Sequence, residues 1–232
     1  MKIGVVTFPG TLDDRDAARA VRLAGAEAVS LWHADTNLHD VDAVVLPGGF
    51  SYGDYLRCGS IARFSPIMGA VRDAANAGVL VIGICNGFQI LCEAGLLPGT
   101  LQRNTGLLFR CEHRHLRVEN TATPFTSVLH KGQVLDIPIA HGEGNYFADP
   151  ETLRQIEEKG QVLLRYCDAS GNVIPEANPN GSLGNIAGIC SHGRNVFGLM
   201  PHPERVCDPL LGGTDGRGIF QSMIEAVQKQ KA

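Results

Sequence analysis

A cysteine with a glycine two residues away on either side is the part of the sequence best suited to covalent chemistry. In the segment 81–89, VIGICNGFQ, Cys85 stands between an apolar run and a helical pattern, flanked by Gly83 and Gly87. This arrangement is typical of a nucleophile elbow, a tight strand-to-helix turn that needs residues without Cβ beside the nucleophile. The start of the helix favours a thiolate, and the backbone N–H of Asn86 can donate to an oxyanion. The pattern therefore predicts a nucleophile rather than only a small buried residue.

A nucleophilic cysteine needs a base and a group that orients the base. Among the eight histidines, His202 lies within MPHPE (200–204), where prolines follow both the methionine and the histidine and keep the chain extended. Residues two apart in an extended chain point to the same side, so Glu204 can reach the imidazole and fix its tautomer. His141 is a rival base, because Glu143 gives it the same spacing.

The pattern G-x-C-x-G-x-Q with a late His-x-Glu resembles the class I, triad-type glutamine amidotransferases. The resemblance implies that Cys85 attacks the side-chain amide of glutamine to form a thioester. It also implies that His202, oriented by Glu204, protonates the departing ammonia and then activates water. The loop Pro47-Gly48-Gly49 would supply a second oxyanion donor, from the N–H of Gly49. The implied substrate and oxyanion residues are Gly48, Gly49, Asn86 and Gln89.

Longer segments resemble one subfamily, the glutaminase subunits of phosphoribosylformylglycinamidine synthase, an enzyme of purine synthesis. These segments are 47–54 (PGGFSYGD), 141–144 (HGEG), 178–182 (NPNGS), 188–190 (GIC) and 201–205 (PHPER). They occur in order along nearly the whole chain. The segment 10–14 (GTLDD) departs from the subfamily, where an Asn-Cys pair is expected. It lies outside the expected triad, so we expect it to affect only local loop contacts.

The sequence contains no G-x-x-x-x-G-K-[ST] loop, although building an amidine from an amide requires ATP. The glycine-rich run 212–216 follows no predicted strand and is a weak phosphate loop. The resemblance therefore implies that this chain carries no cofactor and that ATP and Mg²⁺ bind a partner. The implied partners are a large synthetase subunit, which receives ammonia through a protected channel, and a small accessory subunit. L-glutamine is the implied substrate, and its hydrolysis should be slow until the partner organises the site.

Two other functions explain part of the pattern. A stand-alone cysteine hydrolase, peptidase-like or a γ-glutamyl hydrolase, would use Cys85 and His202 but would not require Gln89. A binding module on a flavodoxin-like fold would carry an inert cysteine. Release of ammonia from glutamine separates the first alternative from an amidotransferase, and alkylation of Cys85 by a glutamine-mimicking electrophile tests the second.

The segment 103–119 contains other residues that could bind a ligand. Cys111, His113 and His115 lie on one side of a predicted strand, but no fourth metal ligand is evident, so a structural or docking role is favoured. The same segment is locally basic through Arg103, Arg110, Arg114 and Arg117. It lacks interleaved aromatic residues that could stack on bases, and acidic residues interrupt it. No metal or nucleic acid is therefore expected here.

The elements that position these residues alternate in the first hundred residues. Strands are predicted at 3–8, 27–32, 41–46 and 79–84, and helices at 13–23, 61–77 and 87–94. This alternation predicts an α/β fold with a mostly parallel, open, flavodoxin-like sheet and helices on both faces. The second half predicts antiparallel additions at 107–118, 133–140 and 161–166, a hairpin of 185–190 with 195–200, and a closing helix at 218–230. No linker divides the chain, so we predict a single domain, 1–232.

Composition limits the location and the partners. The chain has 232 residues, 44% hydrophobic and 19% charged, with a formal net charge of −4. This balance argues against general nucleic-acid or membrane-surface binding, and no apolar run approaches the ~20 residues that span a bilayer. The N-terminus lacks a signal-peptide pattern. Seven scattered cysteines without a CxxC pair indicate free thiols. We therefore expect a soluble cytoplasmic protein.

Overall fold

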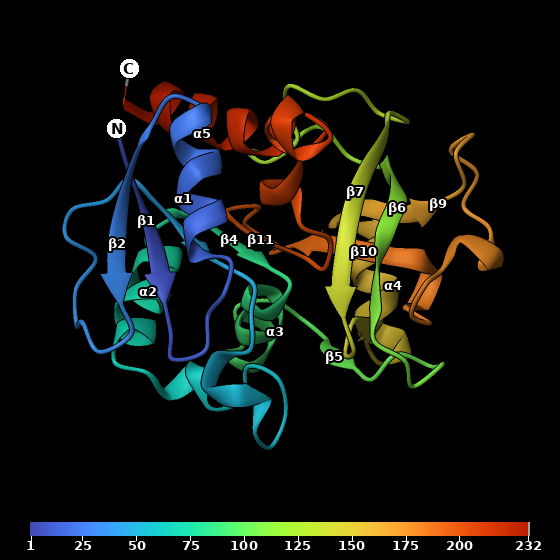
Figure 1. Ribbon diagram of the computed structural model, residues 1–232, viewed down its shortest axis with the longest axis horizontal. Helices are drawn as coiled ribbons and strands as arrows, with labels where there is room; N and C mark the ends of the chain where they lie inside the picture. Colours follow the sequence, from blue (N-terminus) through green and yellow to red (C-terminus); the bar gives the residue numbers. More distant parts are fainter. Residues whose placement is uncertain (232) are drawn as a thin grey trace.

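A nine-stranded sheet runs through the molecule in the order β2-β1-β3-β4-β11-β10-β9-β6-β7 (Figure 1). The computed structural model describes residues 1–231. The parallel strands are β2 (Glu27–Trp32), β1 (Lys2–Thr7), β3 (Ala43–Leu46), β4 (Leu80–Ile84) and β11 (Val196–Leu199). The antiparallel strands are β10 (Ile186–Cys190), β9 (Val162–Cys167), β6 (Arg110–Val118) and β7 (Val134–His141). The predicted α/β class, with a parallel sheet and antiparallel additions, is confirmed.

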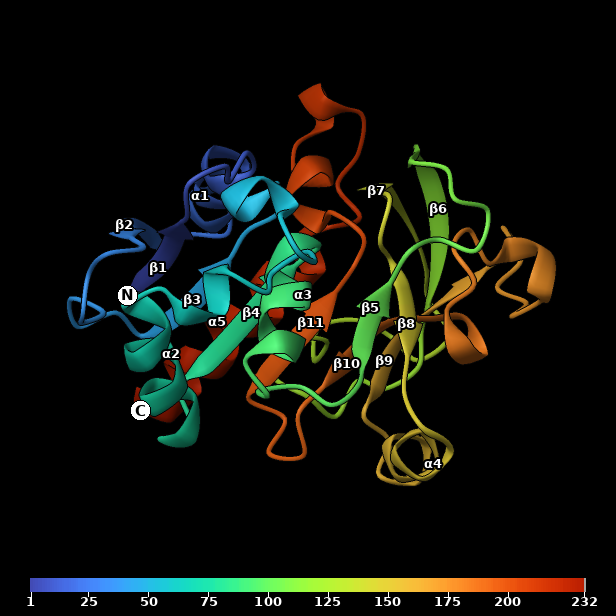
Figure 2. The same cartoon turned by 90° about the horizontal axis from the view of Figure 1, so that it is seen from below.

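Helices cover both faces of the parallel part. The helices are α1 (Asp14–Leu23), α2 (Ile67–Asn76), α3 (Asn86–Glu93), α4 (Pro150–Glu158) and α5 (Arg217–Lys231). Helices α1 and α2 lie on opposite sides of the β2-β1-β3 region (Figure 2). Helix α1 contacts α5, and α3 packs against β4 and β11. Helix α4 lies beside the antiparallel strands (Figure 2).

The burial of the strands follows from their residue pattern. Strands β3 and β4 are apolar throughout, and every residue in them is buried, as expected for parallel strands with helices on both faces. In β7, buried residues recur at every second position, so one face of this strand packs on the core and the other is more accessible. No described helix is both long and apolar enough to cross a bilayer.

Two predictions about elements need correction, and some elements were not predicted. The predicted helix 61–77 is interrupted, because Pro66 holds Ser65 extended; α2 begins only at Ile67, after a short 3₁₀ turn at Ala62–Phe64. The predicted strand 107–118 begins as β6 at Arg110. Helix α4 and the two-stranded sheet of β5 (Thr100–Gln102) and β8 (Asn145–Phe147) were not predicted.

Candidate active site

The loops that follow four parallel strands meet at one edge of the sheet. Neighbouring strands β1, β3, β4 and β11 run in the same direction, so their carboxyl ends share this edge. The packing at Gly48 demonstrates how closely the loops approach. A Cβ on Gly48 would lie 2.5 Å from Asp13 Oδ2, 2.8 Å from His202 Cε1 and 3.4 Å from Cys85 Cβ. Residues from the two ends of the chain therefore surround the predicted nucleophile.

Cys85 occupies the strained turn that the sequence predicts. Its φ of 51° and ψ of −105° are unusual for a residue with a side chain. Gly83 and Gly87 pack against each other there, and a Cβ on Gly87 would overlap the carbonyl oxygen of Leu46. The Cys85 side chain is 5% exposed, and its Sγ donates weakly to the carbonyl of Ala140 at 3.7 Å. The turn therefore holds the sulfur at the end of β4, beside the start of α3.

The imidazole of His202 pairs with Glu204, as the spacing predicts. The distance from His202 Nδ1 to Glu204 Oε1 is 2.6 Å, and both side chains are buried. With Nδ1 occupied, Nε2 is the ring nitrogen left for the sulfur, and it has no hydrogen-bond partner among the described residues. Burial opposes a charge on the ring, but Glu204 and Cys85 outweigh it and raise the pKa of His202 to about 10. The structure thus brings Cys85, His202 and Glu204 together.

Asp13 reaches the same histidine, which corrects the expectation that segment 10–14 affects only local contacts. Its Oδ2 lies 3.5 Å from His202 Nδ1, and its Oδ1 accepts a hydrogen bond from Arg205 at 2.7 Å. The possible metal-ligand atoms of Asp13, His202 and Glu204 lie within 4.8 Å of one another, a grouping able to hold a metal ion. The ring and the guanidinium already engage these carboxylates, so ion pairing explains the cluster.

A pocket of 160 Å³ opens beside Cys85. It is lined by Gly49, Phe50, Asp54, Cys58, Cys85, Gln89, Phe109, Ala140, His141, Gly142 and Glu143. Gln89 Nε2 donates to the Glu143 carbonyl at 2.7 Å, and Asn86 Nδ2 donates to Gln89 Oε1 at 2.9 Å and to Asp54 Oδ1 at 3.3 Å. Of the predicted substrate and oxyanion residues, Gly49 and Gln89 line the pocket, while Gly48 and Asn86 are not among its lining residues.

Two acidic side chains, Asp54 and Glu143, line this pocket. Asp54 lies in the motif 47–54, and the sequence offers Glu143 either as the partner of the rival histidine or, together with His141, as a lining residue of the pocket or the partner interface; both His141 and Glu143 line the pocket. Burial, followed by the nearby charge of Glu143, raises the pKa of Asp54. The Glu143 carboxylate lies 3.6 Å from Arg103, which is largely exposed. The pocket therefore presents negative charge close to the nucleophile.

The geometry favours His202 over His141 as the base. His141 Nδ1 lies 3.2 Å from Asn104 Oδ1, and Glu143, at the spacing that made this pair a rival, turns toward Arg103 instead. Burial and the neighbouring His202 lower the pKa of His141 to about 4. His141 is thus a neutral wall of the pocket without a carboxylate to orient it.

The remaining sequence features do not form a second site. Cys111, His113 and His115 do not converge on a common point in the described part of the chain, and His113 pairs with Asp136 at 3.1 Å. Besides Arg103, which pairs with Glu143, two of the basic side chains are paired with acidic neighbours. These pairs are Arg114 with Glu112 and Arg117 with Glu119.

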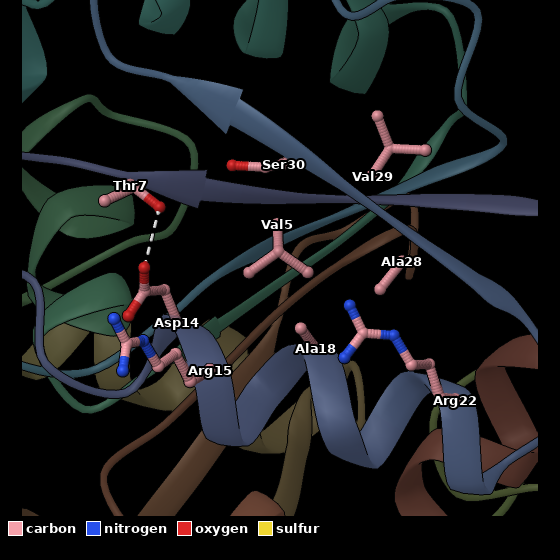
Figure 3. A pocket seen from close by; sticks show the side chains of 9 residues that line it. All are labelled: Val5, Thr7, Asp14, Arg15, Ala18, Arg22, Ala28, Val29 and Ser30. Atoms are coloured by element: carbon pink, nitrogen blue, oxygen red, sulfur yellow. Dashed lines mark hydrogen bonds between the residues drawn. The ribbon is translucent and has the colours of Figure 1, made fainter.

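A larger hollow of 370 Å³ lies between α1 and strands β1 and β2 (Figure 3). Arg15 and Arg22 flank it, and Thr7 donates to Asp14 at 3.0 Å within it. None of its lining residues is a cysteine or histidine. Because the smaller pocket contains Cys85, with the buried His202–Glu204 pair beside it, we take that pocket as the candidate active site.

Comparison with known proteins gives matches along most of the chain. The family of CobB/CobQ-like glutamine amidotransferase domains matches residues 1–214. A phosphoribosylformylglycinamidine synthase subunit PurQ from Moorella thermoacetica is 57% identical over 226 residues, covering 97% of this chain and 96% of that protein. The PurQ subunit from Salinibacter ruber is 58% identical over 227 residues, covering 97% of each.

Solved structures also match nearly the whole length of the chain. The structure of PurLQS from Thermotoga maritima superposes with a TM-score of 0.87 and 43% identity, covering 97% of this chain and 98% of that chain. A glutamine amidotransferase from Thermotoga maritima shares the fold at 13% identity, with a TM-score of 0.62 and coverage of 98% and 97%.

Proposed function

Because this chain belongs to the family of CobB/CobQ-like glutamine amidotransferase domains, we propose that it is the glutaminase subunit of a phosphoribosylformylglycinamidine synthase. The family inferred from the motifs is confirmed. The specific synthase is supported by the PurQ relatives, which this chain matches over nearly their whole length. This full-length match favours a synthase subunit over the stand-alone hydrolase. The observation that carries the chemistry is the buried His202–Glu204 pair beside Cys85.

The reaction follows from the arrangement of these three side chains. Nε2 of His202 takes the proton of the Cys85 thiol, and the sulfur attacks the side-chain carbonyl carbon of glutamine. The N–H groups of Gly49 and Asn86 donate to the developing oxyanion. His202 protonates the leaving nitrogen as the C–N bond breaks, which releases ammonia and leaves a γ-glutamyl thioester. The ring then accepts a proton from water, which attacks the thioester; the C–S bond breaks, glutamate leaves, and the proton returns from the ring to the sulfur. Glu204 keeps Nδ1 protonated throughout, so Nε2 carries each proton.

The acidic wall of the pocket supports an amino acid as the substrate. Asp54 and Glu143 repel each other there, since the charge of Glu143 raises the pKa of Asp54. The α-ammonium group of glutamine would relieve this repulsion while its side-chain amide reaches Cys85. A volume of 160 Å³ suits a small amino acid rather than a peptide.

Exposed apolar side chains around the pocket support a partner subunit. Phe50 and Phe109 line the pocket and pack against each other at a centroid distance of 6.4 Å, yet both are exposed. Apolar residues exposed on the same two loops are Tyr55, Leu56, Leu107 and Leu108, with Leu56 93% exposed. Such a patch is typical of a protein interface. The large synthetase subunit would cover it and would carry ATP and Mg²⁺, with a small accessory subunit completing the complex.

We place the reaction in the cytoplasm, because all seven cysteines are free in the structure and a reducing compartment keeps thiols in that state.

The test is Cys85→Ala in the complex with the synthetase subunit. Glutamine-dependent synthesis should fall by about 10⁶-fold, while synthesis from free ammonia continues. Cys92→Ala on α3 is the matched control, since its thiol contacts the carbonyl of Pro98 instead of the pocket, and it should keep both activities. Loss of ammonia-dependent synthesis in Cys85→Ala, or retained use of glutamine, would contradict the proposal.

A further inference from the structure

Asp13 occupies the position of a helix cap but does not cap the helix. It is the N-cap residue of α1, where an aspartate normally accepts hydrogen bonds from the first turn, worth about 1 kcal/mol. Its side chain makes no such bond. The carboxylate turns instead into the active site, where it is only 4% exposed. A buried carboxylate without these local hydrogen bonds must be stabilised by partners elsewhere in the structure.

The reason lies in its contacts with His202 and Arg205. Asp13 Oδ2 lies 3.5 Å from His202 Nδ1, the nitrogen that also bonds to Glu204 at 2.6 Å. Asp13 Oδ1 accepts a hydrogen bond from Arg205 Nη2 at 2.7 Å. The absence of a side chain at Gly48 makes room for this approach, because a Cβ there would lie 2.5 Å from Asp13 Oδ2. Two carboxylates therefore face one ring nitrogen, and a guanidinium anchors the second.

We propose that Asp13 is a positioning residue for His202: its carboxylate, anchored by Arg205, forms a second anionic contact at Nδ1 and stabilises the charged ring. Backbone bonds tie Asp13 to the oxyanion loop as well, since the N–H groups of Leu12 and Asp13 donate to the Gly48 carbonyl at 3.3 and 3.2 Å. The loop after β1 thus supports the base and the oxyanion loop together.

Several charged or titratable groups surround the His202 ring. The groups that face it are Cys85 from the turn after β4, Asp13 from the loop after β1, His141 from β7, and Glu204 and Arg205 from its own segment. Arg205 partly offsets the charge of Asp13, and burial opposes the raised pKa that Asp13 gives Arg205. Removing Asp13 leaves this guanidinium uncompensated beside the ring. Removing Arg205 leaves the carboxylate uncompensated.

Removal of Asp13 and removal of Arg205 should therefore change the proton affinity of the His202 ring in opposite directions. The test follows the ring nitrogens of His202 by NMR as a function of pH, in the full chain carrying Cys85→Ala so that the thiolate does not contribute. Asp13→Asn should lower the proton affinity of the ring by about tenfold. Arg205→Met should raise it, and the double variant should lie between the two. Asp14→Asn, which removes a neighbouring carboxylate that bonds to Thr7 instead, is the matched control and should leave the titration unchanged.

A purely structural role would move both variants in the same direction or in neither, and that result would overturn the proposal. If Asp13→Asn does not fold, Arg205→Met alone decides, because a lowered or unchanged proton affinity contradicts it. The titration does not depend on the proposed function. A second measurement does: in the assembled complex, Asp13→Asn should lower kcat about tenfold and leave KM for glutamine within twofold, since Asp13 does not line the pocket. A raised KM with unchanged kcat would also overturn the proposal.

Discussion

At the level of single residues, the partner of His202 Nδ1 determines what Nε2 can do. A carboxylate beside Nδ1 accepts a hydrogen bond from the Nδ1–H group and keeps the proton on that nitrogen, so that Nε2 is free to exchange protons with sulfur and substrate. Glu204 meets this need at 2.6 Å from a fully buried position. An amide in its place would remove the charge and would also offer an N–H to the same nitrogen, which favours the wrong tautomer.

Glu204→Gln should therefore lower the pKa of His202 and slow glutamine hydrolysis by about 10²- to 10⁴-fold. His202→Ala should cost about 10⁶-fold, because it removes the proton carrier itself. Initial rates of glutamate formation by the assembled complex measure both variants. Equal losses in the two variants would mean that Glu204 does more than orient the ring.

The sequence predicted the residues of the site that local spacing can reveal. Cys85 has flanking glycines, and Glu204 follows His202 by two positions in a proline-stiffened stretch. The position of Asp13 next to His202 could not be predicted in this way. Their contact depends on which strands are neighbours in the sheet, and this information is not contained in any short segment. The catalytic and substrate-binding roles stay predictions.

At the level of elements, the turn between β4 and α3 depends on close backbone packing. Gly87→Ala should lower the free energy of unfolding by about 1–3 kcal/mol, because the new Cβ would overlap the carbonyl oxygen of Leu46. Gly69→Ala is the matched control: Gly69 lies inside α2, and a Cβ there meets no atom within 4 Å. This control should gain up to about 1 kcal/mol. Urea unfolding measures both, and an unchanged Gly87→Ala would contradict the close packing.

Element boundaries can be predicted where a proline or a helix-capping residue marks them. Pro66 stands inside the predicted helix 61–77, and its effect on the preceding residue explains why α2 starts at Ile67. Helix α4 had an equally clear signal, since Asp149 caps it with its side chain and Pro150 occupies its first turn. The short strands β5 and β8 had none, because three residues carry no periodicity and form a strand only through their pairing.

At the level of the whole molecule, alternating strands and helices predicted the parallel half but not the order of the strands. Residues 185–200 were predicted as a hairpin, and β10 and β11 do pair as one. The structure adds that β11 also joins β4 in parallel, which places His202 at the same edge as Cys85. Strand order is a competition between alternative long-range pairings, and a single sequence contains no measure of its outcome.

Two buried histidines on this edge give the folded chain opposite responses to pH. The pKa of His202 is raised to about 10, so its contribution to stability is complete below about 6.5 and is lost as pH rises toward 10. The pKa of His141 is lowered to about 4, because burial and His202 disfavour its charge. Between pH 6.5 and 4 His141 therefore binds a proton in the unfolded chain but not in the folded chain. The free energy of unfolding falls as the pH is lowered through this range.

His141→Gln should therefore flatten the acid side of the stability curve. Between pH 6.5 and 4.5 the wild type should lose on the order of 2–3 kcal/mol more free energy of unfolding than the variant, since each pH unit is worth about 1.4 kcal/mol per proton. Urea titrations of both proteins at several pH values measure this difference. The contribution of the carboxylates is the same in both proteins and cancels in the comparison. His192→Gln replaces an exposed histidine and should keep the wild-type slope. If His141→Gln also keeps that slope, His141 is charged in the folded protein, and the neutral wall inferred for the pocket is wrong.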